Sequence, residues 1–238
     1  QKTVIHIDVD PAEIDKNVCS GIGVAGNLKD NLRHITSQID AASHEAWRQQ
    51  LAGWSDGTGE GEAVGVMRRI NAALAGHDAI VVTDVGQHQM WAAQHLKISK
   101  PRHWITSGGL GAMGFGVPAA MGAQFACPDK EVVVIAGDGG FKMTSQELFT
   151  IAAFHLPITV VVLNNSGLGM IRQLQDALFD SRYMSCELPF RFDFVMYAAA
   201  FGLPGRHISA QDDVRQALVE AMALKRPNLL VVDVPPEE

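Results

Sequence analysis

EVVVIAGDGG at residues 131–140 and ITVVVLNN at residues 158–165 are the two stretches that decide the fold. Each begins with a short run rich in β-branched residues, and a segment of helix length separates the runs, so the pattern predicts strand, helix and strand. Both runs are continuously apolar rather than alternating, which is typical of strands buried on both faces of a parallel sheet. We therefore expect residues 131–136 and 158–163 to be parallel neighbours joined by a crossover.

Polar side chains follow both expected strands. Asp138 and Asn165 stand 27 positions apart in the sequence. Parallel strands bring their carboxyl ends to one edge of the sheet, and neighbouring strands lie ~4.8 Å apart, so these two side chains should be close together. Carboxylate and amide oxygens are ligands that Mg²⁺ prefers, and Mg²⁺ keeps positions for phosphate oxygens. The pair therefore predicts a site for a metal-bound diphosphate.

The residues between the two strands support this interpretation. Gly139 and Gly140 lack a Cβ, which allows backbone N–H groups to approach a diphosphate. Thr144 and Glu147 have capping-box spacing, which predicts a helix from that point that ends before Pro157. Gly-Asp-Gly alone is a common turn and Asn-Asn a common loop. Together, at this spacing, they favour the metal site.

With these residues the chain resembles the thiamine diphosphate enzymes, whose signature is Gly-Asp-Gly followed by Asn-Asn after somewhat under thirty residues. Three further segments resemble the large catalytic subunit of acetolactate synthase (acetohydroxyacid synthase), and they are VGQHQMW at 85–91, SGGLGAMGFGVPAA at 107–120 and LGMIRQ at 168–173. The similarity extends in order over nearly the whole chain.

The resemblance implies a set of site residues. Side chains of Asp138 and Asn165 and the backbone carbonyl of Gly167 would hold Mg²⁺. The implied cofactor-binding set is Val85, Gly86, Gln87, His88, Gly111, Met113, Gly137, Asp138, Gly139, Gly140, Asn165, Gly167, Leu168, Gly169 and Met170, with 85–88 at the diphosphate and Gly111 and Met113 at the rings. Judged without the resemblance, Gln87 and His88 could instead cap a helix over 89–96, and Met113 could be core packing in a Gly/Ala-rich helix.

The implied function is decarboxylation of pyruvate on thiamine diphosphate and condensation with a second 2-ketoacid, as in branched-chain amino-acid biosynthesis. The glutamate that acts on the pyrimidine ring comes, in this family, from the N-terminal domain of a partner subunit. No catalytic residue is therefore assigned here, and we expect the 238-residue chain alone to bind the cofactor without turnover. Leu174 replaces a usual Trp, and Gly140 replaces a usual Ser.

Two other function classes stay open. The first is a different thiamine diphosphate enzyme, namely a pyruvate oxidase, a 2-ketoacid decarboxylase or a catabolic acetolactate synthase, which would share the metal motif. The second is a non-catalytic assembly module that has lost its cofactor. The intact Asp138, Asn165 and glycines argue against this second class, because packing does not demand such a polar constellation.

The expected fold class is α/β, with a doubly wound, mostly parallel sheet (the thiamine diphosphate-binding fold) after the end of a middle α/β domain. The Gly-rich passage 53–65 is the expected connection, which gives domains at 1–60 and 61–238. The resemblance implies that the first is the remnant of a domain that binds FAD in many members. The patterns predict strands at 3–9, 79–83 and 228–234 and helices at 66–74, 194–201 and 212–224, and the resemblance implies that 28–39 is the last helix of the middle domain.

Composition sets further limits. The 238 residues are 47% hydrophobic and 19% charged with a net charge of −7, and they contain no basic stripe, which argues against nucleic acid as a partner. Cys19, Cys127 and Cys186 are far apart and predict reduced thiols. The apolar runs are too short for a membrane span. We expect a cytoplasmic homo-oligomer, with a small regulatory subunit in some members of the family.

Overall fold

The computed structural model describes residues 2–55, 61–188 and 192–235. The chain forms two compact units, Gln1–Asp56 and Gly57–Glu238. Within the described ranges, none of the helices combines the length and the apolar character that crossing a membrane requires.

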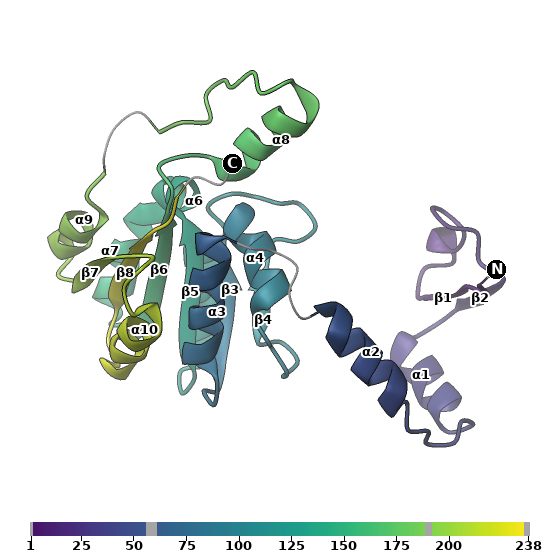
Figure 1. The fold of residues 1–238 in the computed structure, drawn as a ribbon. Helices are drawn as coiled ribbons and strands as arrows, with labels where there is room; N and C mark the ends of the chain where they lie inside the picture. The colour runs from purple at the N-terminus through teal and green to yellow at the C-terminus, as the bar shows by residue number, and fades with distance from the viewer. Residues whose placement is uncertain (1, 56–60, 189–191, 236–238) are drawn as a thin grey trace. The chain divides into compact units, whose positions relative to one another are not determined.

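The second unit is built on a six-stranded sheet in the order β4-β3-β5-β6-β8-β7 (Figure 1). Every strand pair in it is parallel. The strands are β3 (Ala79–Thr83), β4 (Trp104–Thr106), β5 (Glu131–Gly137), β6 (Ile158–Asn164), β7 (Gly205–Ser209) and β8 (Asn228–Asp233). From β3 the chain adds β4 on one side and then β5 on the other, so the winding direction reverses between β3 and β5. Ligands of open α/β sheets bind at such a reversal point.

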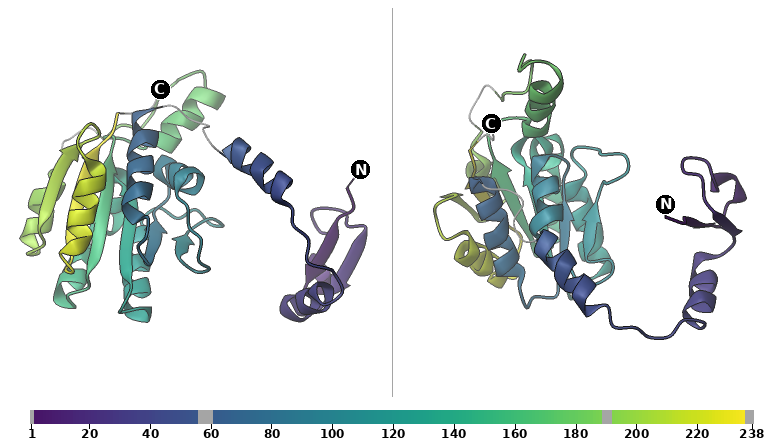
Figure 2. Two further views of the ribbon diagram at one scale, coloured as in Figure 1. Left: turned by 60° about the horizontal axis from the view of Figure 1, so that its bottom comes forward. Right: turned by 45° about the vertical axis from the view of Figure 1, so that its right-hand side comes forward.

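Helices cover both faces of this sheet, as the doubly wound prediction requires. Alternate strand residues pack on one face against α3 (Glu62–Leu74), α4 (Gln87–His95) and α10 (Val214–Ala223). The other face packs against α5 (Gly116–Ala126), α6 (Asp138–Thr144), α7 (Leu148–Ala153) and α9 (Phe194–Ala200). Figure 2 shows α3 and α10 side by side on their face. The remaining elements of this unit are η2 (Ser145–Glu147) and α8 (Gly169–Leu178).

The first unit contains a parallel pair of short strands, β1 (Ile5–Asp8) and β2 (Ile22–Ala25). Asp10 caps η1 (Pro11–Glu13), and Asn27 caps α1 (Leu28–Thr36) by accepting from the Lys29 N–H at 2.9 Å. The helix α2 (Glu45–Ser55) completes the unit. Several apolar side chains are about half exposed or more, including Ile5, Val9 and Ile22. A two-stranded sheet of this size cannot bury them by itself.

Several boundaries differ from those predicted. The helix predicted to start at Thr144 is present as η2 and α7, and a further helix, α6, precedes it from Asp138. Thr144 stands at the N-cap position of η2, but its hydroxyl donates to the Gly114 carbonyl at 3.0 Å and caps no N–H group. The predicted capping-box hydrogen bond is therefore wrong. The helix α3 begins at Glu62 and α2 extends to Ser55, so the expected connection 53–65 is shorter than predicted, and residues 56–60 lie outside the described ranges. The short strands β2, β4 and β7 and the helices α2 and α8 were not predicted, and the expected Gly/Ala-rich helix, α5, begins only at Gly116.

Candidate cofactor site

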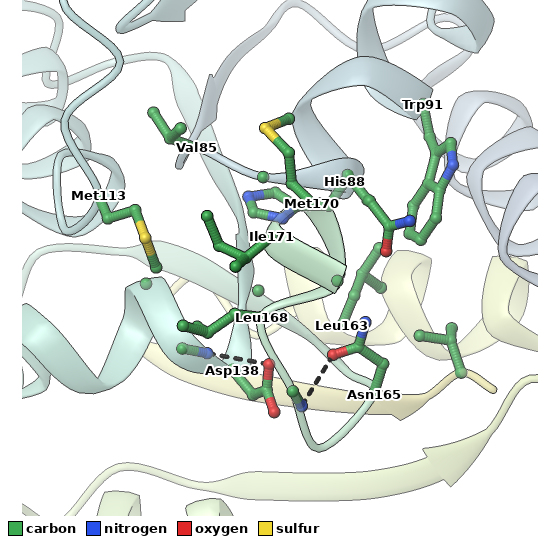
Figure 3. A pocket seen from close by; sticks show the side chains of 18 of the residues that line it. Val85, His88, Trp91, Met113, Asp138, Leu163, Asn165, Leu168, Met170 and Ile171 are labelled. Atoms are coloured by element: carbon green, nitrogen blue, oxygen red, sulfur yellow. Dashed lines mark hydrogen bonds between the residues drawn. The ribbon is translucent and has the colours of Figure 1, made fainter. Parts of the chain in front are cut away.

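A cavity of about 210 Å³ opens at the carboxyl edge of the sheet, where β3, β5 and β6 end (Figure 3). All fifteen residues of the predicted cofactor-binding set line this cavity. Trp91, Leu163, Ile171 and Val234 also line it and were missing from the prediction. The structure therefore brings the three predicted segments, 85–88, 111–113 and 165–170, together with the Gly-Asp-Gly-Gly turn.

Asp138 is the first residue of α6 and is 1% exposed. Its Oδ1 accepts from the Gly139 N–H at 2.9 Å, while its Oδ2 has no partner among the described residues. Burial raises the pKa of Asp138 to about 6, although the Gly139 N–H and the charge of Lys142 act in the opposite direction. A buried carboxylate oxygen without a partner destabilises the ligand-free protein, and a bound cation would relieve that cost.

Asn165 begins the turn after β6, and its Oδ1 accepts from the Gly167 N–H at 3.2 Å. The segment after α8 holds this turn in place by backbone hydrogen bonds. The Leu168 N–H donates to the Cys186 carbonyl at 2.6 Å, and the Leu188 N–H donates to the Ser166 carbonyl at 3.0 Å. In Figure 3, Asp138 and Asn165 lie together on one side of the cavity. The two oxygen donors predicted for one cation are thus neighbours, as the parallel pairing of β5 and β6 requires.

His88 lies in the first turn of α4 and is 5% exposed. A Cβ added at Gly86 or at Gly137 would stand 3.0 Å from the imidazole, so the ring occupies a slot between two glycines. Burial lowers the pKa of His88 to about 4, while the nearby charge of Asp84 acts to raise it. The ring is therefore neutral at pH 7, and one nitrogen can donate to an anion without bringing a charge into the cavity.

Two further polar atoms in the cavity wall lack partners within the described part of the chain. They are His88 Nε2 and Gln87 Oε1. Together with Asp138 Oδ2 they form a group of buried, unpaired polar atoms around one cavity. Buried polar groups in proteins nearly always have partners, so this grouping indicates a polar ligand.

The rest of the wall is apolar. Val85, Met113, Leu168, Met170 and Ile171 contribute side chains to it (Figure 3). Met113 lies in an irregular segment before α5, so the alternative that placed it in a helix is wrong. Gly139 leaves room for the side chain of Leu168, because a Cβ on Gly139 would stand only 2.5 Å from Leu168 Cδ2. The same Cβ would stand 3.6 Å from Met113 Cε. This part of the wall suits the rings of a ligand that has both an apolar and an anionic end.

Among the residues that the structure describes, those lining the cavity include neither Lys nor Arg. Across residues 2–55, 61–188 and 192–235, no group of three His, Cys, Asp or Glu side chains is placed to hold a metal. The predicted donors are of a different kind, since they are one carboxylate, one amide oxygen and one backbone carbonyl. An anionic ligand at this cavity would have to be neutralised by a cation and by backbone N–H groups.

Asp84 is a polar residue of this region whose role sequence reasoning missed. It follows β3 directly, is 1% exposed, and its carboxylate accepts hydrogen bonds from the backbone N–H groups of Val85, Gly114 and Gly116. The available signal was its position, because a carboxylate at the carboxyl end of a buried strand resembles Asp138 in that respect.

Comparison with known proteins identifies the family. The family described as "Thiamine pyrophosphate enzyme, C-terminal TPP binding domain" matches residues 84–234. The chain belongs to this family. The match runs from the residue after β3 to the residue after β8 and therefore includes every residue of the predicted cofactor-binding set.

Acetolactate synthases are among the relatives of this chain. The chain is 42% identical to acetolactate synthase isozyme 2 large subunit of Escherichia coli (strain K12), over 98% of this chain and 43% of that protein. It is 43% identical to the acetolactate synthase large subunit of Parasynechococcus marenigrum (strain WH8102), over 97% of this chain and 39% of that protein. It is 38% identical to acetolactate synthase 1, chloroplastic, of Nicotiana tabacum, over 99% of this chain and 38% of that protein.

The chain thus spans about two fifths of the length of these relatives. The predicted resemblance to the acetolactate synthase large subunit and the predicted α/β fold are confirmed. The comparisons do not favour the other thiamine diphosphate enzymes or the non-catalytic module.

Proposed function

We propose that this chain is the part of an acetolactate synthase that binds the diphosphate of thiamine diphosphate through Mg²⁺. The observation that carries the proposal is the grouping of buried, unpaired polar atoms, Asp138 Oδ2, His88 Nε2 and Gln87 Oε1, around one cavity at the carboxyl edge of the sheet. This is the place and the chemistry that a metal-bound diphosphate needs.

Asp138, Asn165 and the Gly167 carbonyl are the proposed ligands of Mg²⁺. All three supply oxygen atoms, which this hard cation prefers. The unpaired Oδ2 of Asp138 supports the assignment, because it is buried with no hydrogen-bond donor in the described chain. Asn165 would exchange its hydrogen bond from the Gly167 N–H for the cation.

The remaining residues have proposed roles in orienting the cofactor. Backbone N–H groups at Gly139 and Gly140 and the neutral ring of His88 would bind the diphosphate. Met113 and Gly111 would contact the rings, and Leu168, Gly169 and Met170 would cover the metal side. Thiamine diphosphate, when bound, supplies an electron sink for decarboxylation of a 2-ketoacid and for forming a carbon–carbon bond.

The whole enzyme's properties are proposals drawn from its relatives. Pyruvate and a second 2-ketoacid are the proposed substrates, and a partner subunit's N-terminal domain is the proposed source of the catalytic glutamate. Residues 1–60 are proposed to belong to a domain that holds FAD in the longer protein. Homo-oligomerisation, a regulatory subunit and a cytoplasmic location stay predictions.

Calorimetric titration of thiamine diphosphate into the chain, with Mg²⁺ and with EDTA, tests the proposal. Asp138→Asn keeps the shape of the side chain and removes its charge, and Asp213→Asn makes the same change at the N-terminus of α10, outside the cavity. We expect binding that requires Mg²⁺, that Asp138→Asn weakens roughly 100-fold or more, as for loss of a charged ligand, and that Asp213→Asn leaves unchanged.

Inorganic pyrophosphate with Mg²⁺ is a second probe, because it carries the diphosphate without the rings. It should compete with thiamine diphosphate for the site. Equal affinity for Asp138→Asn and the wild type, or binding that EDTA does not affect, would contradict the proposed metal site. Failure of the wild type to bind at millimolar thiamine diphosphate would mean either that the N-terminal domain of a partner subunit is needed to form the site or that the cofactor assignment is wrong, and the same titration of the full-length protein would decide between the two.

A further inference from the structure

Asp84 contacts the backbone of two separate cofactor-facing segments. Its Oδ1 accepts from the Val85 N–H at 2.8 Å and from the Gly114 N–H at 3.1 Å. Its Oδ2 accepts from the Gly116 N–H at 2.7 Å. One carboxylate therefore ties the start of segment 85–88 to segment 111–116, although about thirty residues separate them in the sequence.

The position of Asp84 is itself fixed by the sheet. Its backbone N–H donates to the Ile135 carbonyl at 2.9 Å, which continues the β3–β5 ladder by one residue. The side chain is nearly fully buried. A carboxylate in such a place is stable only when hydrogen-bond donors surround it, and here the donors are the backbone N–H groups of the two segments.

The helix α5 depends on this carboxylate for its N-terminus. Phe115 occupies the N-cap position and makes no side-chain capping hydrogen bond. The Gly116 N–H, at the first position of α5, instead donates to Asp84, which supplies the negative charge that favours a helix N-terminus. Gly114 has a φ of +84°, a conformation that suits glycine, and its carbonyl accepts from Thr144 on α6.

The Gly-Asp-Gly-Gly turn also meets Asp84. A Cβ on Gly140 would overlap Oδ1 of Asp84, and a Cβ on Gly116 would stand 3.0 Å from Asp84 Cβ. Three of the segments that line the cavity thus converge on this carboxylate. Glycine at 140 and 116 provides the space that it occupies.

We propose that Asp84 is a positioning residue: its buried carboxylate holds the backbones of 85–88 and 111–116 in the arrangement that accepts thiamine diphosphate. The proposal rests on the proposed function of the cavity. Asp84 does not line the cavity itself, so it would act on the cofactor through the residues that do. Loss of the Asp84 carboxylate should leave the proposed metal ligands at 138, 165 and 167 in place. It should make the backbones of 85–88 and 111–116 more mobile.

The test combines cofactor affinity with hydrogen–deuterium exchange on the full 238-residue chain. Asp84→Asn is the deciding variant, because it keeps the size of the side chain but places an NH₂ donor against at least one backbone N–H. Asp84→Ala removes every hydrogen bond. Asp213→Ala is the matched control, since Asp213 also accepts from a backbone N–H at a helix N-terminus, that of Gln216 at 2.9 Å, outside the cavity.

For Asp84→Asn we expect the Kd for thiamine diphosphate with saturating Mg²⁺ to rise roughly ten-fold or more, which corresponds to about one or two lost hydrogen bonds. Amide exchange in 85–88 and 111–116 should accelerate in the cofactor-free protein, while exchange in β6 and β8 stays slow. Asp213→Ala should accelerate exchange in α10 and leave the Kd unchanged.

An unchanged Kd in folded Asp84→Asn would overturn the proposal, and so would exchange that accelerates uniformly over the sheet, since that result shows a global stability effect. Failure of the proposed function is a separate outcome, because the wild type itself would then not bind thiamine diphosphate. The exchange measurement needs no cofactor and therefore still tests the backbone contacts.

Discussion

The imidazole of His88 occupies the space into which a side chain at Gly137 would project. A Cβ at Gly137 would stand 3.0 Å from Nδ1 and 3.1 Å from Cε1 of His88. Gly137 has a φ of −81°, which any residue can adopt, so it is the imidazole and not the backbone conformation that restricts this position. Helix α4 and strand β5 therefore come together at this slot.

Gly137→Ala should displace His88. We expect a loss of about 1–3 kcal/mol in the free energy of unfolding, as for overpacking of a dense interior, and weaker binding of thiamine diphosphate. The double variant Gly137→Ala, His88→Ala should recover part of the stability, because the removed ring makes room for the methyl group. Urea unfolding of the two single variants and the double variant measures this coupling.

Gly122→Ala is the control for that substitution. Gly122 lies in α5, and a Cβ there meets nothing within 4 Å. Alanine is a better helix former than glycine, so this change should stabilise the chain by about 0.5–1 kcal/mol. Equal effects of the two alanines would contradict the role assigned to the His88 slot.

The sequence predicted the centre of the sheet well, because burial leaves a strong signal there. The expected strand 131–136 corresponds to β5, Glu131–Gly137, and 158–163 corresponds to β6, Ile158–Asn164. The edge strands β4 and β7 were missed for physical reasons. Trp104–Thr106 has only three residues, and Gly205–Ser209 reads GRHIS with two exposed polar residues, so neither contains an apolar run.

The residues that line the cavity were predicted as a set, but the tertiary hydrogen bonds that hold their segments in place were not. The Gly-Asp-Gly and Asn-Asn motifs identify their own positions, and the parallel topology brings them together. Thr144 instead bonds to Gly114, and Asp84 bonds to Gly114 and Gly116, across about thirty residues. Such tertiary hydrogen bonds leave no local periodicity, which is why capping-box spacing at Thr144 was misleading.

Asp138 and His88 should make opposite contributions to stability as the pH changes. The Asp138 pKa rises from its ordinary 3.8 to about 6. Its stabilising contribution to the free energy of unfolding is therefore fully present below pH 3.8 and is lost as the pH rises through 6. The His88 pKa falls from 6.5 to about 4, so its contribution is present above pH 6.5 and is lost as the pH falls through 4. Each shift corresponds to about 3 kcal/mol.

Variants that remove one group should therefore differ from the wild type in a pH-dependent way. In the absence of metal and cofactor, Asp138→Asn should be more stable than the wild type at pH 7, and this gain should disappear near pH 4. His88→Gln should be less stable than the wild type at pH 7, and this deficit should shrink by pH 4. Urea unfolding at several pH values measures both differences, and differences that stay constant with pH would contradict the assigned shifts.

Phe141 connects the hydrophobic core to the metal side of the cavity. It is fully buried on α6, three residues after Asp138, and its ring lies edge-on to that of Phe194 with centroids 5.7 Å apart. Phe141→Ala should lower the free energy of unfolding by about 3–5 kcal/mol. Phe149→Ala, at a side chain that is 68% exposed, should cost less than about 1 kcal/mol. Equal costs in urea unfolding would show that α6 does not pack in the core as described.

Removal of metal should abolish the stabilisation that the cofactor provides. A ligand at 100 times its Kd stabilises a folded protein by about 2.7 kcal/mol, which raises the Tm of a domain of this size by roughly 5–10 °C. We expect that increase with thiamine diphosphate and Mg²⁺ together and little change with thiamine diphosphate and EDTA, because the lining residues in the described part of the chain contain no Lys or Arg to neutralise the diphosphate. Asp138→Asn should show no increase under either condition, since it lacks the charged ligand, whereas Asp213→Asn should respond like the wild type. An equal rise in Tm with EDTA would mean that backbone N–H groups and His88 suffice to hold the diphosphate, and the metal assignment of Asp138 and Asn165 would then be wrong.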